Sequence, residues 1–173
     1  MQQNHKKNTV KNNNFLYAAA GIVAAYLIYI KMKTSSLLDK AAAFIKPFES
    51  FSPNTFWDFK QWSIGYGTVA KTNVEVITEP VASARLSMEL VPLNNRLAAY
   101  HITPVLNDNE KIALLSFGFN LGVGDLNIML RRLSEGMSRV DVASKMNLYY
   151  NAGGAVSPGL VIRRKAEVNL FLS

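Results

Sequence analysis

Two acidic residues in an aromatic stretch have the types and surroundings needed for acid–base chemistry. Glu49 lies between Phe48 and Phe51, and Asp58 follows in a polar turn. Burial of a carboxyl group among aromatic rings favours its protonated form, whereas a carboxyl group in a polar turn stays ionised. Cleavage of a glycosidic bond uses such a pair: one group protonates the leaving oxygen, and the other activates water or stabilises the cationic sugar.

Each of these residues also has a structural interpretation. An isolated Glu beside a helix end is usually a solvated surface group, and an Asp in a turn often bonds the backbone. Ser63 could be a plain strand residue, and Glu167 is interpreted as structural. The aromatic residues of the stretch could stack on sugars, but we expect core packing for Trp57, Trp62 and Tyr66.

The elements that position these acids follow from the apolar pattern. Apolar residues over 37–48 recur at helical spacing, and Pro47 should kink or end this helix close to the first acid. Residues 55–69 are rich in aromatic and β-branched types, which predicts a small antiparallel sheet or hairpin that carries Asp58 and Ser63.

The remainder of the chain is predicted to be helical. Expected helices cover 81–100, with an interruption or kink at Pro92, and then 108–119, 125–133, 140–149 and 157–172. Loops separate them, including one at 151–154 that contains two glycines. The predicted fold class is therefore α+β, with one helix, a small sheet and a mostly helical region.

Composition excludes several classes of site. The chain has 173 residues, which suits one domain, and it has no cysteine and two histidines, His5 and His101. A metal cluster, a Cys nucleophile and a His-based triad are therefore not expected, and no cofactor is implied. Six lysines and one acid in residues 1–40 account for most of the net charge of +7, and no aromatic-interleaved basic stripe indicates nucleic-acid binding.

The first 33 residues differ in pattern from the rest. Residues 1–14 are polar and are predicted to be a disordered basic tail. Phe15 to Ile30 is uncharged and would form a helix about 24 Å long. We predict a transmembrane or signal-anchor helix over 15–33, and a catalytic domain over 34–173. A buried core helix and a cleaved signal peptide are the alternatives.

Three blocks of sequence resemble the phage-type lysozymes, the endolysins of glycoside hydrolase family 24. The blocks are 48–49 with 57–58 and 62–67, then 114–122, and finally 153–154 with 159–167. The resemblance covers roughly residues 37–172 and implies a lysozyme-like fold.

The resemblance also implies roles for individual residues. Glu49 matches the catalytic acid, Asp58 the second acid, and Ser63 a hydroxyl residue, usually Thr, that helps to hold water or sugar. Four further positions match residues that line the sugar cleft or contact the acid: Phe119, Asn120, Arg163 and Arg164. One of the two arginines would contact the catalytic acid, and the sequence does not choose between them.

The expected function is that of a muramidase without a metal or cofactor. It would act as a monomer on the β-1,4 bond between N-acetylmuramic acid and N-acetylglucosamine of peptidoglycan, and so lyse bacterial cell walls. Its N-terminal segment would hold it in the inner membrane with the catalytic domain on the periplasmic side, and later release to the periplasm is one option. A lytic transglycosylase, a non-catalytic wall-binding protein and a permanently anchored muramidase remain alternatives.

Overall fold

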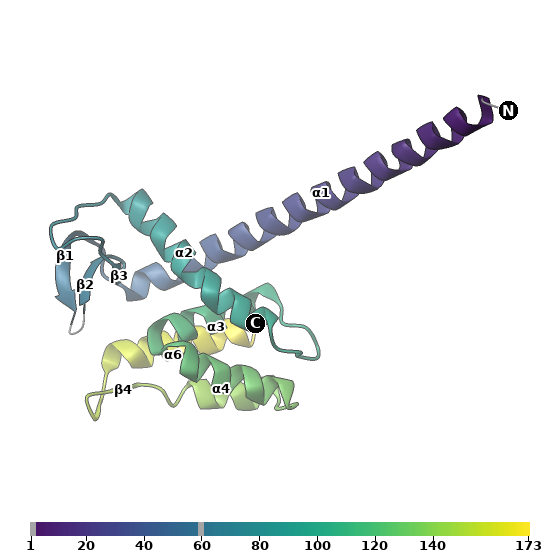
Figure 1. Cartoon of the computed structure of the whole chain (residues 1–173). Helices are drawn as coiled ribbons and strands as arrows, with labels where there is room; N and C mark the ends of the chain where they lie inside the picture. Colours follow the sequence, from purple (N-terminus) through teal and green to yellow (C-terminus); the bar gives the residue numbers. More distant parts are fainter. Residues whose placement is uncertain (1–2, 59–60) are drawn as a thin grey trace. The chain divides into compact units, whose positions relative to one another are not determined.

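The chain divides into two units, Met1–Ser36 and Leu37–Ser173, which are described separately here. The computed structural model describes the backbone of residues 3–58 and 61–173 (Figure 1). Among residues 1–21, the structure describes only the side chains of residues 17 and 20. The second unit carries the three sequence blocks that hold the predicted site.

A single helix, α1, covers Gln3–Ile45 and continues from the first unit into the second. Residues 1–2 of the predicted tail lie outside the described residues, and residues 3–14, expected to be disordered, are helical. The five asparagines among these residues are weak helix formers, but a turn added to an existing helix costs less than a new nucleus. The second effect accounts for the difference.

The apolar part of α1 lies in the first unit, where exposed apolar side chains occur from Ile22 to Met32. The predicted membrane segment, residues 15–33, includes five positions whose side chains lie outside the described residues. Within the described part of the chain, no helix combines the length and the apolar character that crossing a membrane requires.

The second unit begins with the last turns of α1, whose buried side chains include Leu38, Ala41 and Ile45. A short 3-10 helix, η1 (Lys46–Phe48), follows and contains Pro47. Glu49 is the C-cap of η1 and has an extended backbone, with φ −112° and ψ 130°. The prediction that the helix ends at Pro47, next to the acid, is confirmed.

An antiparallel sheet follows, with strand order β1-β2-β3. Its strands are β1 (Ser52–Asp58), β2 (Gln61–Gly65) and β3 (Thr68–Val69). Gly65 has φ +67°, and a Cβ atom there would lie 2.8 Å from the Cβ of Ala82 on the next helix. Because only glycine fits this close approach, the sheet can pack directly against that helix.

Five helices complete the unit: α2 (Glu79–Ala98), α3 (Asp108–Leu121), α4 (Val123–Ser134), α5 (Arg139–Met146) and α6 (Pro158–Phe171). Of the interruption or kink expected at Pro92, the interruption does not occur, since α2 continues through Pro92 as one helix. The expected loop before α6 instead forms a small hairpin, β4 (Asn151–Ala152) and β5 (Ala155–Val156).

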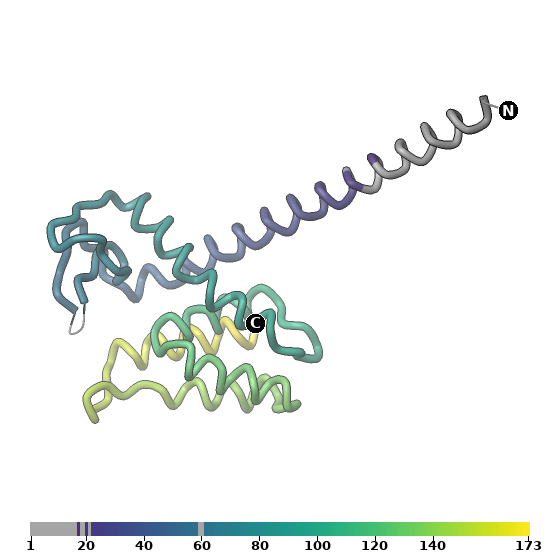
Figure 2. Tube along the Cα trace, in the orientation of Figure 1, coloured from purple at the N-terminus to yellow at the C-terminus, as the bar shows by residue number. Residues whose placement is uncertain are grey.

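Helix α3 is the centre of the core. It contacts α2, α4 and α6, and it buries every residue from 112 to 118. Its first turn is closed by a capping box between Asn107 and Glu110, which satisfies two backbone donors that a helix start otherwise leaves free. The trace in Figure 2 shows α6 returning beside α3. This contact places Arg164 of α6 next to Asn120, one of the predicted cleft residues of α3.

Candidate active site

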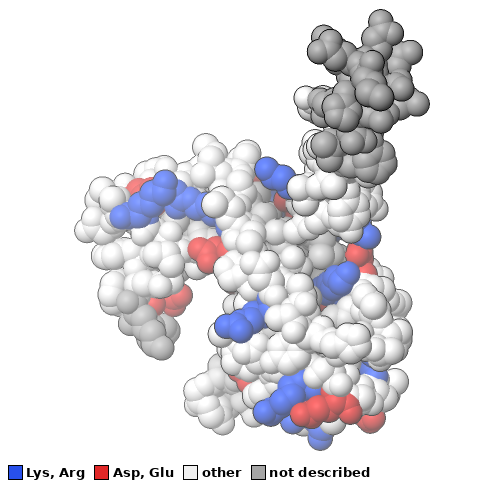
Figure 3. Space-filling view, turned by 45° about the vertical axis from the view of Figure 1, so that its right-hand side comes forward, with Lys and Arg blue, Asp and Glu red and all other residues white. Residues whose placement is uncertain are grey.

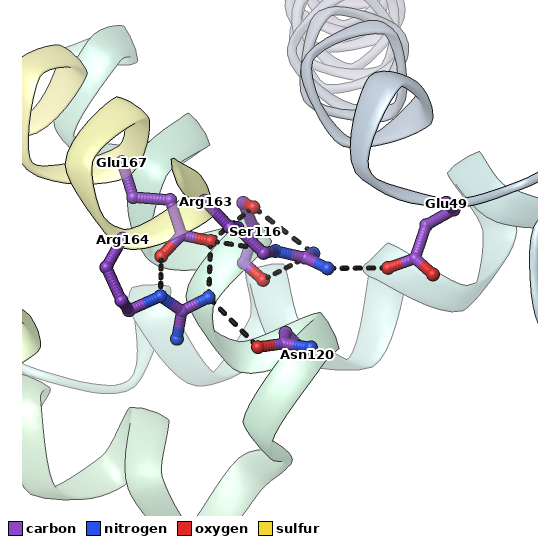
Figure 4. Close-up of polar contacts among 6 residues, drawn as sticks. All are labelled: Glu49, Ser116, Asn120, Arg163, Arg164 and Glu167. Carbon is purple, nitrogen blue, oxygen red and sulfur yellow. Dashed lines mark hydrogen bonds and ion pairs between the residues drawn. The ribbon is translucent and has the colours of Figure 1, made fainter. Parts of the chain in front are cut away.

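The carboxylate of Glu49 is held by an arginine from the other end of the unit. Its Oε1 accepts a hydrogen bond from Nη1 of Arg163 at 2.6 Å (Figure 4). The Glu49 side chain is 25% exposed. The guanidinium of Arg163 also lies over the ring of Phe48, 5.4 Å from its centroid. Glu49 is therefore fixed in direction but remains accessible on one side.

This environment differs from the one expected from sequence. Glu49 was expected to be buried between two aromatic rings, but its side chain is 25% exposed and is ion-paired with Arg163, which also lies over the Phe48 ring. The ring of Phe51 turns instead to Tyr66, at a centroid distance of 5.6 Å. The Glu49 carboxylate is thus partly exposed and ion-paired with Arg163, and the ring of Phe51 packs elsewhere.

Arg163 is itself held from behind by two residues. Its Nε donates to Oε1 of Glu167 at 3.1 Å, and its Nη2 donates to the backbone oxygen of Ser116 at 3.2 Å and, more weakly, to the Ser116 hydroxyl at 3.4 Å. The side chain of Arg163 is 4% exposed. Each of the three guanidinium nitrogens therefore has a partner, and one of them faces the acid.

Arg164 has a different function in the fold. It is fully buried, its Nη2 donates to Oδ1 of Asn120 at 3.0 Å and to Oε1 of Glu167 at 2.9 Å, and its guanidinium lies over the Phe117 ring at 4.9 Å. Its Nε is within ion-pair distance of Glu167 Oε2, at 2.9 Å, although the two atoms are not aligned as a hydrogen bond. Burial lowers the pKa of Arg164, and the charge of Glu167 opposes this shift. The structure thus assigns the contact with the acid to Arg163.

The two predicted cleft residues of α3 lie at its C-terminal end. Asn120 is half-buried, and its amide oxygen is fixed by Arg164. Phe119 is half-buried and packs against the core. The structure brings Asn120 into the same hydrogen-bond network as Arg164 and Glu167. Contact with a sugar remains a prediction for both residues.

Asp58 and Ser63 lie on the same face of the sheet. Asp58 pairs with Gln61 and Ser63 with Phe56, so the two residues are diagonal neighbours on adjacent strands. Asp58 is exposed. Ser63 is fully buried, and within the described residues its hydroxyl has no hydrogen-bond partner. The shared face supports joint action, and the burial of Ser63 counts against direct contact with solvent water.

The sheet also presents two tryptophans that were predicted to be core residues. Trp57 pairs with Trp62 across the strands, and their rings meet edge to face at 5.6 Å. They are 59% and 40% exposed, so the prediction of core packing is wrong for both. The core ends at Ile64 on this face, and the tryptophans lie beyond it, nearer the end of the hairpin. Tyr66, in contrast, is buried as predicted.

The surface of the second unit has a concave region. Figure 3 shows a deep hollow in the second unit, with acidic and basic side chains both at its margin. Within the described residues, no three His, Asp or Glu side chains are grouped closely enough to hold a metal ion. The side chains that the site brings together offer carboxyl, hydroxyl and guanidinium groups.

Sequence reasoning missed the part that Ser116 and Glu167 play in this site. Ser116 lay inside a recognised block and was not singled out, and Glu167 was interpreted as structural. One signal was present: an acid three and four residues after two arginines lies on the same side of a helix. This spacing does not indicate that Glu167 is fully buried.

The fold and the site define the class of protein. A helix that ends at an acid, a small antiparallel sheet with a second acid, and a helical region that supplies an arginine to the first acid form a lysozyme-like α+β fold. The chain belongs to the phage lysozyme family, whose family model matches residues 46–167.

Individual relatives agree with this assignment. The endolysin of Lactococcus phage c2 is 33% identical over 118 residues, which cover 66% of this chain and 49% of that protein, so the chain spans about half the length of this relative. The muramidase domain of SpmX from Asticaccaulis excentricus is 30% identical, with a TM-score of 0.68 over 78% of this chain and 95% of that one. A mutant of P22 lysozyme is 25% identical, with a TM-score of 0.66 over 78% and 96%.

Proposed function

We propose that this protein is a muramidase of the endolysin type, within glycoside hydrolase family 24. It hydrolyses the β-1,4 bond between N-acetylmuramic acid and N-acetylglucosamine of peptidoglycan and thereby lyses bacterial cell walls. The observation that carries the proposal is the contact between Glu49 Oε1 and Arg163 Nη1, at 2.6 Å, in a unit whose sheet presents a second acid. Similarity to a muramidase domain and to a phage endolysin supports it.

Glu49 is the general acid of this proposal. Arg163 engages Oε1, so Oε2 is the oxygen that carries the proton to the glycosidic oxygen. As the proton leaves, negative charge develops on the carboxylate, and the guanidinium stabilises it through a charge-assisted hydrogen bond. An interaction that strengthens as the reaction proceeds lowers the barrier, whereas one that is equal in both states does not.

Asp58 and Ser63 act on the other side of the bond. The exposed carboxylate of Asp58 stabilises the oxocarbenium-like transition state or activates the attacking water. Ser63 lies diagonally across the strands and assists by binding that water. Because the hydroxyl of Ser63 is buried, its part requires that flanking side chains of the sheet move when the sugar binds.

The first experiment compares the wild type with Glu49→Gln on purified peptidoglycan. Loss of the general acid should lower the rate of glycan cleavage by about 10²-fold or more, because proton transfer to the leaving oxygen no longer occurs. The exposed Glu89 on α2 offers a matched control, and Glu89→Gln should cleave at the wild-type rate. Initial rates follow from loss of turbidity and from release of reducing ends.

Mass spectrometry of the products separates the alternatives. Reducing muramic acid ends indicate hydrolysis, whereas 1,6-anhydro ends would identify a lytic transglycosylase. Glycan cleavage by Glu49→Gln at the wild-type rate would remove Glu49 from the mechanism. A wild-type protein that binds walls without cutting them would leave a wall-binding function in place of the proposed one.

We further propose that the N-terminal segment associates with the inner membrane and that the catalytic unit acts on the periplasmic side. Support comes from the uncharged run Phe15 to Ile30 and from the exposed apolar side chains between Ile22 and Ile30. Fractionation of cells that produce the full chain tests the idea, with protease added from the periplasmic side. Recovery of the intact chain only from the cytoplasm would contradict it.

A further inference from the structure

The buried carboxylate of Glu167 contacts Arg163 on the side away from Glu49, and the proposed mechanism does not use it. We propose that Glu167 is a positioning residue for catalysis, which together with Ser116 sets the direction of Arg163 and thereby of Glu49. The inference rests on the proposed function for its kinetic consequences. Its structural content, the coupling of Glu167 to Glu49 through one guanidinium, can be measured without any substrate.

Glu167 is fully buried, and one of its oxygens is the meeting point of three donors. Oε1 accepts from the Ser116 hydroxyl at 2.6 Å, from Arg163 Nε at 3.1 Å and from Arg164 Nη2 at 2.9 Å (Figure 4). The donors come from two helices, α3 and α6. A carboxylate held from three directions inside the core is a fixed reference point for the groups bonded to it.

That reference point determines where the outer edge of Arg163 points. A guanidinium is planar and rigid, so two of its nitrogens fixed in place leave the third no freedom of direction. Nε is bonded to Glu167 and Nη2 to the backbone oxygen of Ser116. Nη1 therefore points at Glu49 and meets Oε1 at 2.6 Å. Without the inner bonds, Arg163 could follow the acid instead of directing it.

The charged groups around Glu167 also affect the ionisation of Glu49. Within the described contacts, the charged groups around Glu167 are Arg163 and Arg164, and the charged group around Glu49 is Arg163. The buried group of two arginines and one carboxylate thus carries one net positive charge toward Glu49. Burial raises the pKa of the Glu167 carboxyl, and the two guanidinium groups and the Ser116 hydroxyl oppose that rise.

Substitution of Glu167 with Gln separates positioning from simple structural support. The amide keeps the size of the side chain and one acceptor oxygen, but it removes the negative charge. The positive charge of Arg163, which faces Glu49, is then no longer offset by Glu167, and it favours the ionised form of Glu49 over the acid form that donates the proton. The alkaline limb of the pH–activity profile should therefore move to lower pH by about one unit, the lower end for an added neighbouring charge.

The experiment measures kcat and KM on purified peptidoglycan from pH 4 to 9 for the full chain and for Glu167→Gln. We expect kcat to fall about tenfold or more with KM within about twofold, together with the shift of the alkaline limb. Carboxyl carbon NMR of Glu49, recorded without substrate, should show ionisation at lower pH in the variant. Glu167→Asp should restore the wild-type ionisation of Glu49, because it restores the charge.

Glu110 supplies the matched control, because it is another buried acid with an arginine partner, Arg139, at 2.8 Å. Glu110→Gln should lower stability but leave the pH–activity profile and the ionisation of Glu49 unchanged. If Glu167→Gln does not fold, Ser116→Ala tests the same network and should lower kcat at least threefold with KM unchanged.

The outcomes distinguish this inference from the proposed function. A folded Glu167→Gln with wild-type kcat and an unshifted Glu49 titration would overturn the inference, as would wild-type kcat in Ser116→Ala. A wild-type protein without glycan cleavage would overturn the proposed function alone, because the shift in the Glu49 titration would still report the coupling.

Discussion

Replacement of Arg163 tests the residue that bonds Glu49, Glu167 and Ser116 together. Arg163→Ala removes the cation from Glu49, and it leaves Glu167 paired with Arg164 alone. The loss of one partner from a buried ion pair costs about 3–5 kcal/mol, because the remaining charge stays buried and uncompensated. Glu49 is 25% exposed and can regain water, so we expect a loss near the lower end, about 3 kcal/mol.

The same substitution should reduce activity more than stability alone explains. A general acid that is no longer held in direction loses much of its contribution, and we expect kcat/KM to fall about 10²-fold. Arg163→Lys should lie between the two proteins, because an ammonium group keeps the charge but cannot bond Glu49, Glu167 and Ser116 together.

Urea unfolding followed by circular dichroism gives the free energy of unfolding, and initial rates on peptidoglycan give the activity. The exposed Arg131 on α4 provides the control, and Arg131→Ala should stay within about 0.5 kcal/mol of the wild type. An Arg163→Ala protein with wild-type stability and with activity within threefold would refute the reasoning about this contact.

Two further predictions concern the supporting structure. Gly65→Ala should lower the free energy of unfolding by about 2–4 kcal/mol, because its Cβ would lie 2.8 Å from the Cβ of Ala82 and the backbone has φ +67°. Gly124→Ala is the control and should not lower it, because a Cβ there meets nothing within 4 Å. Thermal melts of both variants test this prediction. A hydrogen bond from Lys46, helped by two hydroxyl groups, lowers the pKa of Glu79 from 4.5 to about 2. The stability from this carboxylate should be complete above about pH 4.5 and lost as the pH falls toward 2, so the difference in unfolding free energy between wild type and Glu79→Gln should close over that range; a difference that stays constant would count against it.

In the buried network, a single arginine pairs with two carboxylates. Arg163 serves two carboxylates at once, one in the core and one at the surface of the site. A buried ion pair adds little stability relative to well-packed apolar residues, so its presence indicates a requirement other than stability. In this protein the requirement that matches the geometry is a fixed direction for Glu49.

Much of the fold could be predicted from local patterns. The helix that ends at Pro47, the aromatic and β-branched sheet after it, and the helical remainder all follow from residue type and spacing over short distances. Two local predictions were incomplete: α2 continues through Pro92 as one helix, and the residues on either side of the turn Gly153–Gly154, where both glycines have positive φ, pair as a short hairpin.

The site shows where local patterns end. The sequence by itself determined the two acidic residues, the arginine pair and the helices and strands that carry them. These features depend only on residue type and on spacing between residues that are close in the chain. Only the tertiary structure decided that Arg163 meets Glu49 across 114 residues and that Arg164 turns to Asn120. Adjacent residues on a helix point about 100° apart, so the packing of α6 against α3 made that choice. Packing likewise buried the Ser63 hydroxyl, because burial depends on side chains that are distant in the chain.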